Sequence, residues 1–94
     1  MKNSHSVDFS KYIEKILLGH AENDLDTLRT QIHSIKSIAN LVGALNLAHY
    51  CQEAEKLLIA SSSLMECEGA IILVVHEASR IQREMDFTPS HRTI

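Results

Sequence analysis

Apolar residues recur in steps of three and four along four stretches of this chain, at residues 7–18, 24–42, 46–60 and 64–85. This period matches one face of an α-helix and predicts four amphipathic helices. The run AIILVV at 70–75 would suit a buried strand if it stood alone, but the helical period continues in phase on both sides. We therefore expect residues 70–75 to belong to a helix that is buried on more than one face.

The predicted helix ends rest on capping residues and glycines. Side-chain oxygens that can accept a hydrogen bond from the first helical turn stand before three of the stretches, and glycine suits the left-handed turn that ends a helix. We expect the first helix to stop at Gly19 and the second at Gly43. The candidate N-caps are Ser6 or Asp8, Asn23 or Asp24, and Asn46.

Four helices joined by short connections favour an all-α fold, an antiparallel up-down-up-down four-helix bundle. With 94 residues the chain is long enough for one domain, which we assign to 1–94 with frayed ends at 1–5 and 87–94. Three glycines and one proline supply too few turns for a β-sandwich. The chain is also too short for a fold with its own nucleotide site, and no GxxxxGK[ST] motif is present.

Charge and composition exclude further classes. The net charge of −3 lacks the basic footprint of a nucleic-acid-binding protein. No apolar run approaches the roughly 20 residues of a membrane helix, and the first residues have no apolar leader segment. Cys51 and Cys67 lie within apolar patterns, which favours buried, reduced thiols over a disulfide. We expect a cytoplasmic protein that binds neither nucleic acid nor membrane.

His33 stands out among six histidines because of its neighbours on the helical wheel. At about 100° per residue, the face centred on His33 is polar and lies opposite the apolar stripe of the second helix. A solvent-facing imidazole between cations suits a nucleophile that accepts a phosphoryl group, because a neutral ring can attack without a separate base. The same pattern also fits an ordinary solvated helix face. The polar face comprises Asp26, Arg29, Thr30, Lys36, Ser37 and Asn40.

The stretch from residue 33 to 55, HSIKSIANLVGALNLAHYCQEAE, resembles the signature of histidine phosphotransfer (HPt) domains. The resemblance implies a four-helix bundle with the phosphoacceptor, His33, exposed on the second helix. On this face Lys36 can offset phosphoryl charge, and we expect Arg29, Ser37, Asn40 and Gly43 to support the site or the docking of a partner. The family commonly has Gly where this chain has Ser37. The positions that match are His33, Lys36, Ala39, Leu41, Gly43, Ala44, Leu47, Cys51 and Glu55.

The resemblance further implies a phosphocarrier in a multistep phosphorelay of two-component signalling. Its expected partners are receiver domains of response regulators, including that of a hybrid histidine kinase. We expect no cofactor on this chain, since Mg²⁺ belongs to the receiver domain, and no kinase activity. Ile38 and Leu41 are either docking or core residues. One alternative is a helical docking or dimerising module without phosphate chemistry. Another is a metal-binding bundle, which the absence of any Glu-x-x-His motif disfavours.

Overall fold

The computed structural model describes residues 8–60 and 63–87, and these residues form four helices. All are long enough for three or more turns, and the last is the longest with 24 residues. They are α1 (Ser10–Ala21), α2 (Leu25–Val42), α3 (Leu45–Ala60) and α4 (Leu64–Phe87). The expected frayed ends at 1–5 and 88–94 lie outside the described residues, whereas Phe87 belongs to α4.

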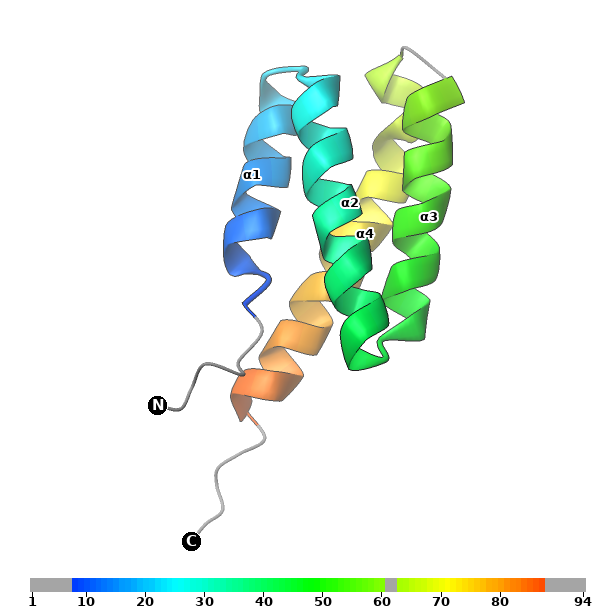
Figure 1. Ribbon diagram of the computed structural model, residues 1–94. Coiled ribbons are helices and arrows are strands. Elements are labelled where there is room, and N and C mark those ends of the chain that lie inside the picture. The colour runs from blue at the N-terminus through cyan, green and yellow to red at the C-terminus, as the bar shows by residue number, and fades with distance from the viewer. Residues whose placement is uncertain (1–7, 61–62, 88–94) are drawn as a thin grey trace, which may run out of the picture.

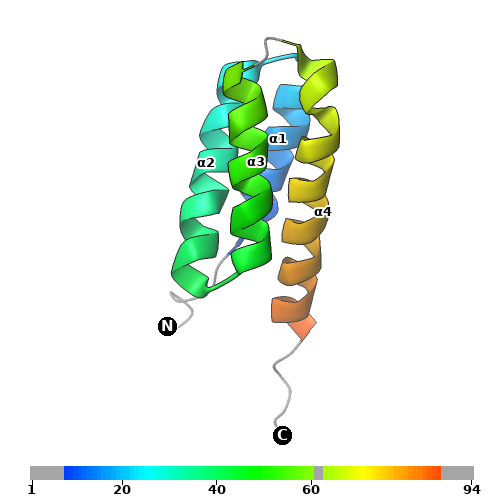
Figure 2. The same ribbon diagram turned by 90° about the vertical axis from the view of Figure 1, so that its right-hand side faces the viewer.

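Successive helices run in opposite directions and pack as a four-helix bundle, as predicted (Figure 1). Helix α2 contacts α1 and α3, and α4 contacts α3 and closes the bundle against α1. A view turned by 90° shows α2, α3 and α4 across one side of the bundle, with α1 behind them (Figure 2). Helices α2 and α4 therefore lie on opposite corners of the bundle.

One stripe of each helix forms a continuous core. The apolar stripes expected in α2 and α3 are buried, except that Leu25 is partly buried and Val42, at the end of α2, is 44% exposed. The expectation that residues 70–75 are buried on more than one face is wrong, because Ile72 and Leu73 are exposed while Ile71 and Val74 are buried. Helix α4 packs mainly against α1 and α3, so the side turned away from the bundle is not covered. The buried apolar side chains are those of Phe9, Ile16, Leu28, Ile32, Ile35, Ala39, Leu47, Ala48, Cys51, Ala54, Leu58, Cys67, Ile71, Val74 and Ala78.

The first helix differs from its prediction at both ends. It begins at Ser10 with Phe9 as its N-cap and no side-chain cap, so the prediction of Asp8 as the N-cap is wrong. The Asp8 carboxylate only accepts a hydrogen bond from the Ser10 amide at 2.9 Å, and Ser6 lies outside the described residues. Gly19 does not stop α1 but lies buried within it. A Cβ at Gly19 would lie 3.2 Å from the side chain of Thr27, so glycine there permits close contact with α2. Asn23, at φ 58°, makes the left-handed turn instead.

Helix α2 is held at both ends by the residues that the sequence indicated. The carboxylate of Asp24 accepts hydrogen bonds from the Thr27 amide at 3.2 Å and the Thr27 hydroxyl at 2.7 Å. Gly43 ends the helix at φ 80°, and the next amide, of Ala44, donates to the Ala39 carbonyl at 2.8 Å. This turn leads directly into α3, which begins at Leu45. The prediction of Asn46 as its N-cap is therefore wrong.

Candidate functional site

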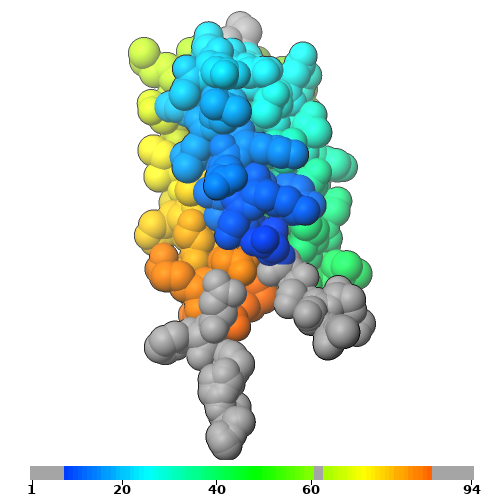
Figure 3. Space-filling view, turned by 90° about the vertical axis from the view of Figure 1, so that its left-hand side faces the viewer, coloured from blue at the N-terminus to red at the C-terminus, as the bar shows by residue number. Residues whose placement is uncertain are grey.

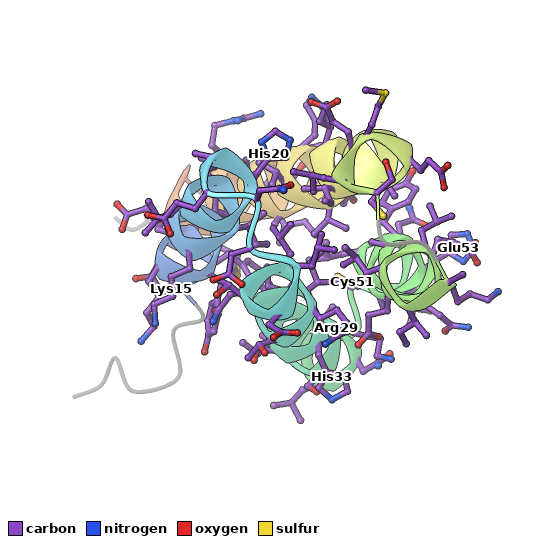
Figure 4. All side chains as sticks on the ribbon, turned by 90° about the horizontal axis from the view of Figure 1, so that it is seen from above. Lys15, His20, Arg29, His33, Cys51 and Glu53 are labelled. Atoms are coloured by element: carbon purple, nitrogen blue, oxygen red, sulfur yellow. The ribbon has the colours of Figure 1, made fainter. Side chains whose placement is uncertain are left out.

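His33 lies in the middle of α2, on the side away from the core. Its side chain is 62% exposed, whereas the preceding residue, Ile32, is completely buried. Figure 4, which looks down the bundle, shows the His33 ring at the outer edge of α2. The regular backbone of α2, fixed by Asp24 and Gly43 at its ends, sets the direction in which this ring projects.

Glu55 of α3 links His33 to Lys36. Its carboxylate lies with one oxygen, Oε2, 2.8 Å from Nδ1 of His33 and with the other, Oε1, 2.6 Å from Nζ of Lys36. The Glu55 side chain is only 17% exposed, because it lies between α2 and α3. The three residues form one ionic cluster across two helices, so the contact between α2 and α3 positions the histidine ring.

The charge of Glu55 decides which nitrogen of the His33 ring bears the proton. Burial by itself raises the pKa of Glu55, but the hydrogen bonds from Lys36 and His33 outweigh it and hold this pKa below its usual value. An ionised carboxylate can only accept hydrogen bonds, so Nδ1 of His33 is the nitrogen that bears the proton. In the neutral ring the lone pair then lies on Nε2, the nitrogen that Glu55 does not contact. The cluster therefore selects one tautomer and leaves one nucleophilic nitrogen.

Lys36 lies one turn after His33 on the same helix. Its side chain is 26% exposed, and its ammonium group binds Glu55. An ammonium group has three donors, so it can hold Glu55 and still donate to an anion that arrives beside the ring. A charge-assisted hydrogen bond of this kind is stronger than a neutral one, especially where water is partly excluded. The site can thus present a nucleophilic nitrogen next to a fixed positive charge.

The family model of the Hpt domain matches residues 7–85, which is most of the 94-residue chain. The chain belongs to the Hpt domain family. Hpt domains act in histidine phosphotransfer within two-component phosphorelays and interact with receiver domains of response regulators. No curated protein and no solved structure matches the chain in the corresponding comparisons.

The other residues expected at this Hpt site are spread along α2. Arg29 forms an ion pair with Asp26 on the same helix, and it is exposed. Ser37 and Asn40 are exposed on the His33 side of α2. Gly43 is about 15 Å from His33 along the helix axis, at ten residues' distance, and its observed role is to end α2. The structure therefore brings together His33, Lys36 and Glu55, and leaves the remaining candidates around them.

Ile38 and Leu41, which were expected to be either docking or core residues, differ in burial. Ile38 is partly buried and packs against the core. Leu41 is 84% exposed, so it belongs to the surface of the Hpt domain and not to its core.

Sequence reasoning did not give Glu55 a role. It is one of the positions that resemble the family, but the rest of α2, the α2–α3 turn and the first part of α3 separate it from His33 in the chain. The available signal is its place on α3, one turn after the buried Cys51, at the edge of the stripe that packs against α2. A carboxylate at such an edge can reach a cation on the neighbouring helix. Which cation it reaches depends on how the two helices pack.

Cys51 lies under the site as a core residue. Burial and the nearby charge of Glu55 raise the pKa of the Cys51 thiol to about 12. The thiol is therefore protonated near neutral pH and has no nucleophilic role here. Cys51 and Cys67 are both free and buried, in agreement with the sequence prediction.

The described residues hold no group of three or more His, Cys, Asp or Glu side chains arranged to bind a metal ion. None of the four helices is both long and apolar enough to cross a membrane, as far as residues 8–60 and 63–87 are concerned. Two surface grooves, of about 370 and 390 Å³, lie away from His33. The first runs between α1 and α4, and the second lies between the α2–α3 turn and the end of α4.

Proposed function

We propose that this Hpt domain accepts a phosphoryl group at Nε2 of His33 from the aspartyl phosphate of one receiver domain and donates it to the aspartate of another. The observation that supports this most is the Glu55 contact at Nδ1 of an exposed histidine ring. That contact holds the proton on Nδ1 and keeps the Nε2 lone pair for attack.

In the proposed step, the Nε2 lone pair attacks phosphorus in line with the bond to the aspartyl oxygen. An N–P bond forms and the P–O bond breaks, so the aspartate leaves with that electron pair as a free carboxylate. The proton on Nδ1 stays in place, and the ring gains positive charge. The Glu55 carboxylate, 2.8 Å away, stabilises this charge. The reverse step restores the neutral ring, which makes the transfer reversible.

Lys36 acts on the phosphoryl oxygens in this proposal. Its ammonium group binds Glu55 at 2.6 Å, on the side of α2 where the ring projects. Phosphoryl transfer depends mainly on positioning and on charge stabilisation, because the transferred group spreads negative charge over three oxygens. One fixed cation beside the acceptor nitrogen supplies part of that stabilisation, and the Mg²⁺ that we assign to the receiver domain supplies the rest.

The proposed partners follow from the same chemistry. The donor must hold an activated phosphoryl group, such as an aspartyl phosphate, and it must approach an exposed polar face. Receiver domains, including that of a hybrid histidine kinase, meet both demands. Ser37, one turn from His33, and Asn40, two turns from it, are small enough to admit them. The relay implies a cytoplasmic location, because kinases that charge such receivers use cytoplasmic ATP.

The test is transfer from a receiver domain charged with radiolabelled acyl phosphate in the presence of Mg²⁺. The unmodified chain is compared with His33→Gln and with His20→Gln as a matched control. His20 also pairs with a carboxylate of another helix, Glu68, at 3.3 Å. We expect label on the unmodified chain and on His20→Gln, stable in alkali and lost in acid, and none on His33→Gln.

Two results contradict the proposal. Label that persists on His33→Gln means that another residue accepts the phosphoryl group. No label from several receivers, on a chain shown by circular dichroism to be helical, favours a docking module without phosphate chemistry.

A further inference from the structure

The row of residues on α3 that contains Glu55 also carries two exposed apolar side chains. Glu55 lies beside α2, because its carboxylate contacts His33 at 2.8 Å and Lys36 at 2.6 Å. Ile59 follows Glu55 by one turn and is 73% exposed, and Leu45, at the start of α3, is 70% exposed. Five residues of α3 recur in steps of three and four, so they lie along one side of the helix. This Glu55 row comprises Leu45, Ala48, Gln52, Glu55 and Ile59.

His33 points away from the bundle on the side where α2 and α3 lie next to each other. Lys36, at about 60° from His33 around α2, reaches Glu55 of α3. Leu41 lies about 80° from His33 in the opposite direction, away from α3. Figure 1 shows α2 and α3 in front of α4, and Figure 4, which views the bundle from above, shows the His33 ring at that front edge. The ring and the Glu55 row therefore face the same partner.

Exposure alone assigns no role to Leu45 or Ile59, because single apolar residues are common on protein surfaces. Their place relative to the site distinguishes them. Ile59 lies about 6 Å beyond Glu55 along α3 and Leu45 about 15 Å before it, so the ionic cluster lies between them. The other exposed large apolar residue of α3, Leu57, is turned about 160° from Glu55 and is 38% exposed. The two most exposed large apolar side chains of α3 thus both lie in the row of Glu55.

The chemistry at His33 determines what covers this row. Transfer requires the partner's phosphoryl group to reach Nε2, so the partner must lie over the ring. A protein–protein interface of standard size buries about 800 Å² on each partner, which corresponds to a patch of about 16 Å radius. A patch of this size centred on His33 includes Ile59 and extends to Leu45. The Glu55 row is therefore continuous with the surface that a phosphoryl donor has to occupy.

We propose that Ile59 and Leu45 are the apolar anchors on which a receiver domain docks, one on each side of the ionic cluster. The proposal rests on the proposed function in taking the receiver domain as the partner, and it adds which side of α2 the receiver covers. The surface beside the receiver's aspartate then meets the two anchors with apolar side chains of its own. Apolar contacts around a polar centre exclude water from it. The anchors act on binding and do not touch the transferred phosphoryl group, so they are docking residues and not catalytic residues.

The test measures binding apart from transfer. A panel of receiver domains, each carrying beryllofluoride in place of the phosphoryl group, is titrated into the full chain in a calorimeter. Beryllofluoride is not transferred to His33, so the dissociation constant reports docking alone. Ile59→Gln and Leu45→Gln each remove an apolar anchor without adding charge. Each should raise the dissociation constant at least about fivefold, whereas Ile59→Met should leave it nearly unchanged.

The matched control is Ile72→Gln on α4. Ile72 is 58% exposed and lines the groove between α1 and α4. Figure 3 looks onto α1, with α4 on one side of it and α2 on the other, so this groove lies away from the side shared by α2 and α3. Ile72→Gln should leave the dissociation constant unchanged, and an effect as large as that of Ile59→Gln would overturn the proposal. All of the substituted residues are exposed, so circular dichroism should show the same helical fold.

Transfer kinetics separate the docking proposal from the proposed function. With a phosphorylated receiver at increasing concentration, Ile59→Gln should raise the half-saturating concentration by the same factor and leave the rate at saturation unchanged. Transfer to His33 together with binding that does not depend on Ile59 contradicts the docking proposal alone. Binding that depends on Ile59 in a chain that accepts no phosphoryl group supports the docking proposal and contradicts the proposed function alone.

Three further outcomes overturn the docking proposal. One is a panel in which no receiver domain binds the chain. Another is the same dissociation constant for Ile59→Gln, for Leu45→Gln and for the unmodified chain. The third is a larger loss of binding with Leu41→Gln than with Ile59→Gln, which would place the receiver on the side of α2 that is turned away from α3.

Discussion

The outer faces of α2 and α4 lie on opposite sides of one core, and their chemistry differs. Between residues 26 and 40 of α2, the described structure has no exposed large apolar side chain, and Leu41 follows as an 84% exposed residue, whereas α4 exposes Met65, Ile72 and Leu73. Both helices bury an inner stripe of the same kind. The difference shows that the inner stripes make the bundle, while each outer face reflects what it meets outside.

The two faces also differ in how firmly the fold holds them. On α2 the exposed ring of His33 is fixed by Glu55, a residue of α3 that is itself mostly buried. On α4 the apolar residues Met65 and Ile72 project freely. A polar, preorganised face suits a partner that binds briefly and leaves after group transfer, and an apolar face suits a contact that lasts longer.

The largest expected effect is that of Lys36→Ala on phosphotransfer. Loss of the only cation in the Glu55 cluster should lower the transfer rate about a hundredfold, because one charged donor near the transferred oxygens is removed. Lys36→Arg should retain a substantial part of the rate, since the charge remains. Single-turnover kinetics with a charged receiver measures both. Equal rates for Lys36→Ala and the unmodified chain would refute a role for Lys36.

Two variants that each add one surface carboxylate test whether the outer faces of α2 and α4 have separate roles. Ser37→Glu places a carboxylate one turn from His33, where it repels the phosphoryl group, and we expect at least about a tenfold slower transfer. Ile72→Glu adds the same charge on the opposite side of the bundle and should leave the rate unchanged. If both variants slow transfer equally, the two faces do not have separate roles.

The Glu55 cluster should make stability depend on pH in the acid range. The pKa of Glu55 is lowered in the folded chain, so its contribution is present above the ordinary value of 4.5 and is lost as the pH falls below it. Glu55→Gln should therefore reduce the free energy of unfolding by about 1 kcal/mol at about pH 7 and by clearly less at about pH 3. Urea titration at the two pH values measures this. A difference that is equal at both would mean that the carboxylate charge is irrelevant.

The smallest expected effects come from two glycines of the two helices. Gly43→Ala forces a side chain into the left-handed region and should destabilise the chain by about 1 kcal/mol. Gly69→Ala should stabilise it by about 0.5 kcal/mol, because Gly69 is helical and open space surrounds it. Thermal unfolding at low protein concentration measures both. A loss of stability in Gly69→Ala would mean that α4 itself needs this glycine.

Much of the bundle could be predicted because its signals are local. The period of the apolar residues gives four helices, and Asp24 and Gly43 define α2 through hydrogen bonds and a left-handed turn made within a few residues. The prediction that Gly19 ends α1 was wrong for the opposite reason. Thr27 of α2 packs closely against Gly19, and the local sequence around Gly19 does not show how closely two helices pack.

The site likewise contains residues that the local sequence could predict and one whose role it could not. His33 and Lys36 could be chosen from helical spacing and from the resemblance to the family, because both lie on one face of one helix. The role of Glu55 could not, since it depends on the register in which α3 packs against α2. The exposure of Ile72 and Leu73 was missed because an apolar run does not reveal which of its sides has a neighbour.

The most direct test of the central claim is to locate the phosphoryl group on the unmodified chain. After transfer from a charged receiver domain, the chain is digested at neutral or alkaline pH and the phosphorylated peptide is identified by mass spectrometry. The chain has six histidines, so the result distinguishes among six acceptors. We predict one phosphohistidine, in the peptide that contains His33. A phosphoryl group at any other histidine, or on no histidine at all, would contradict the account.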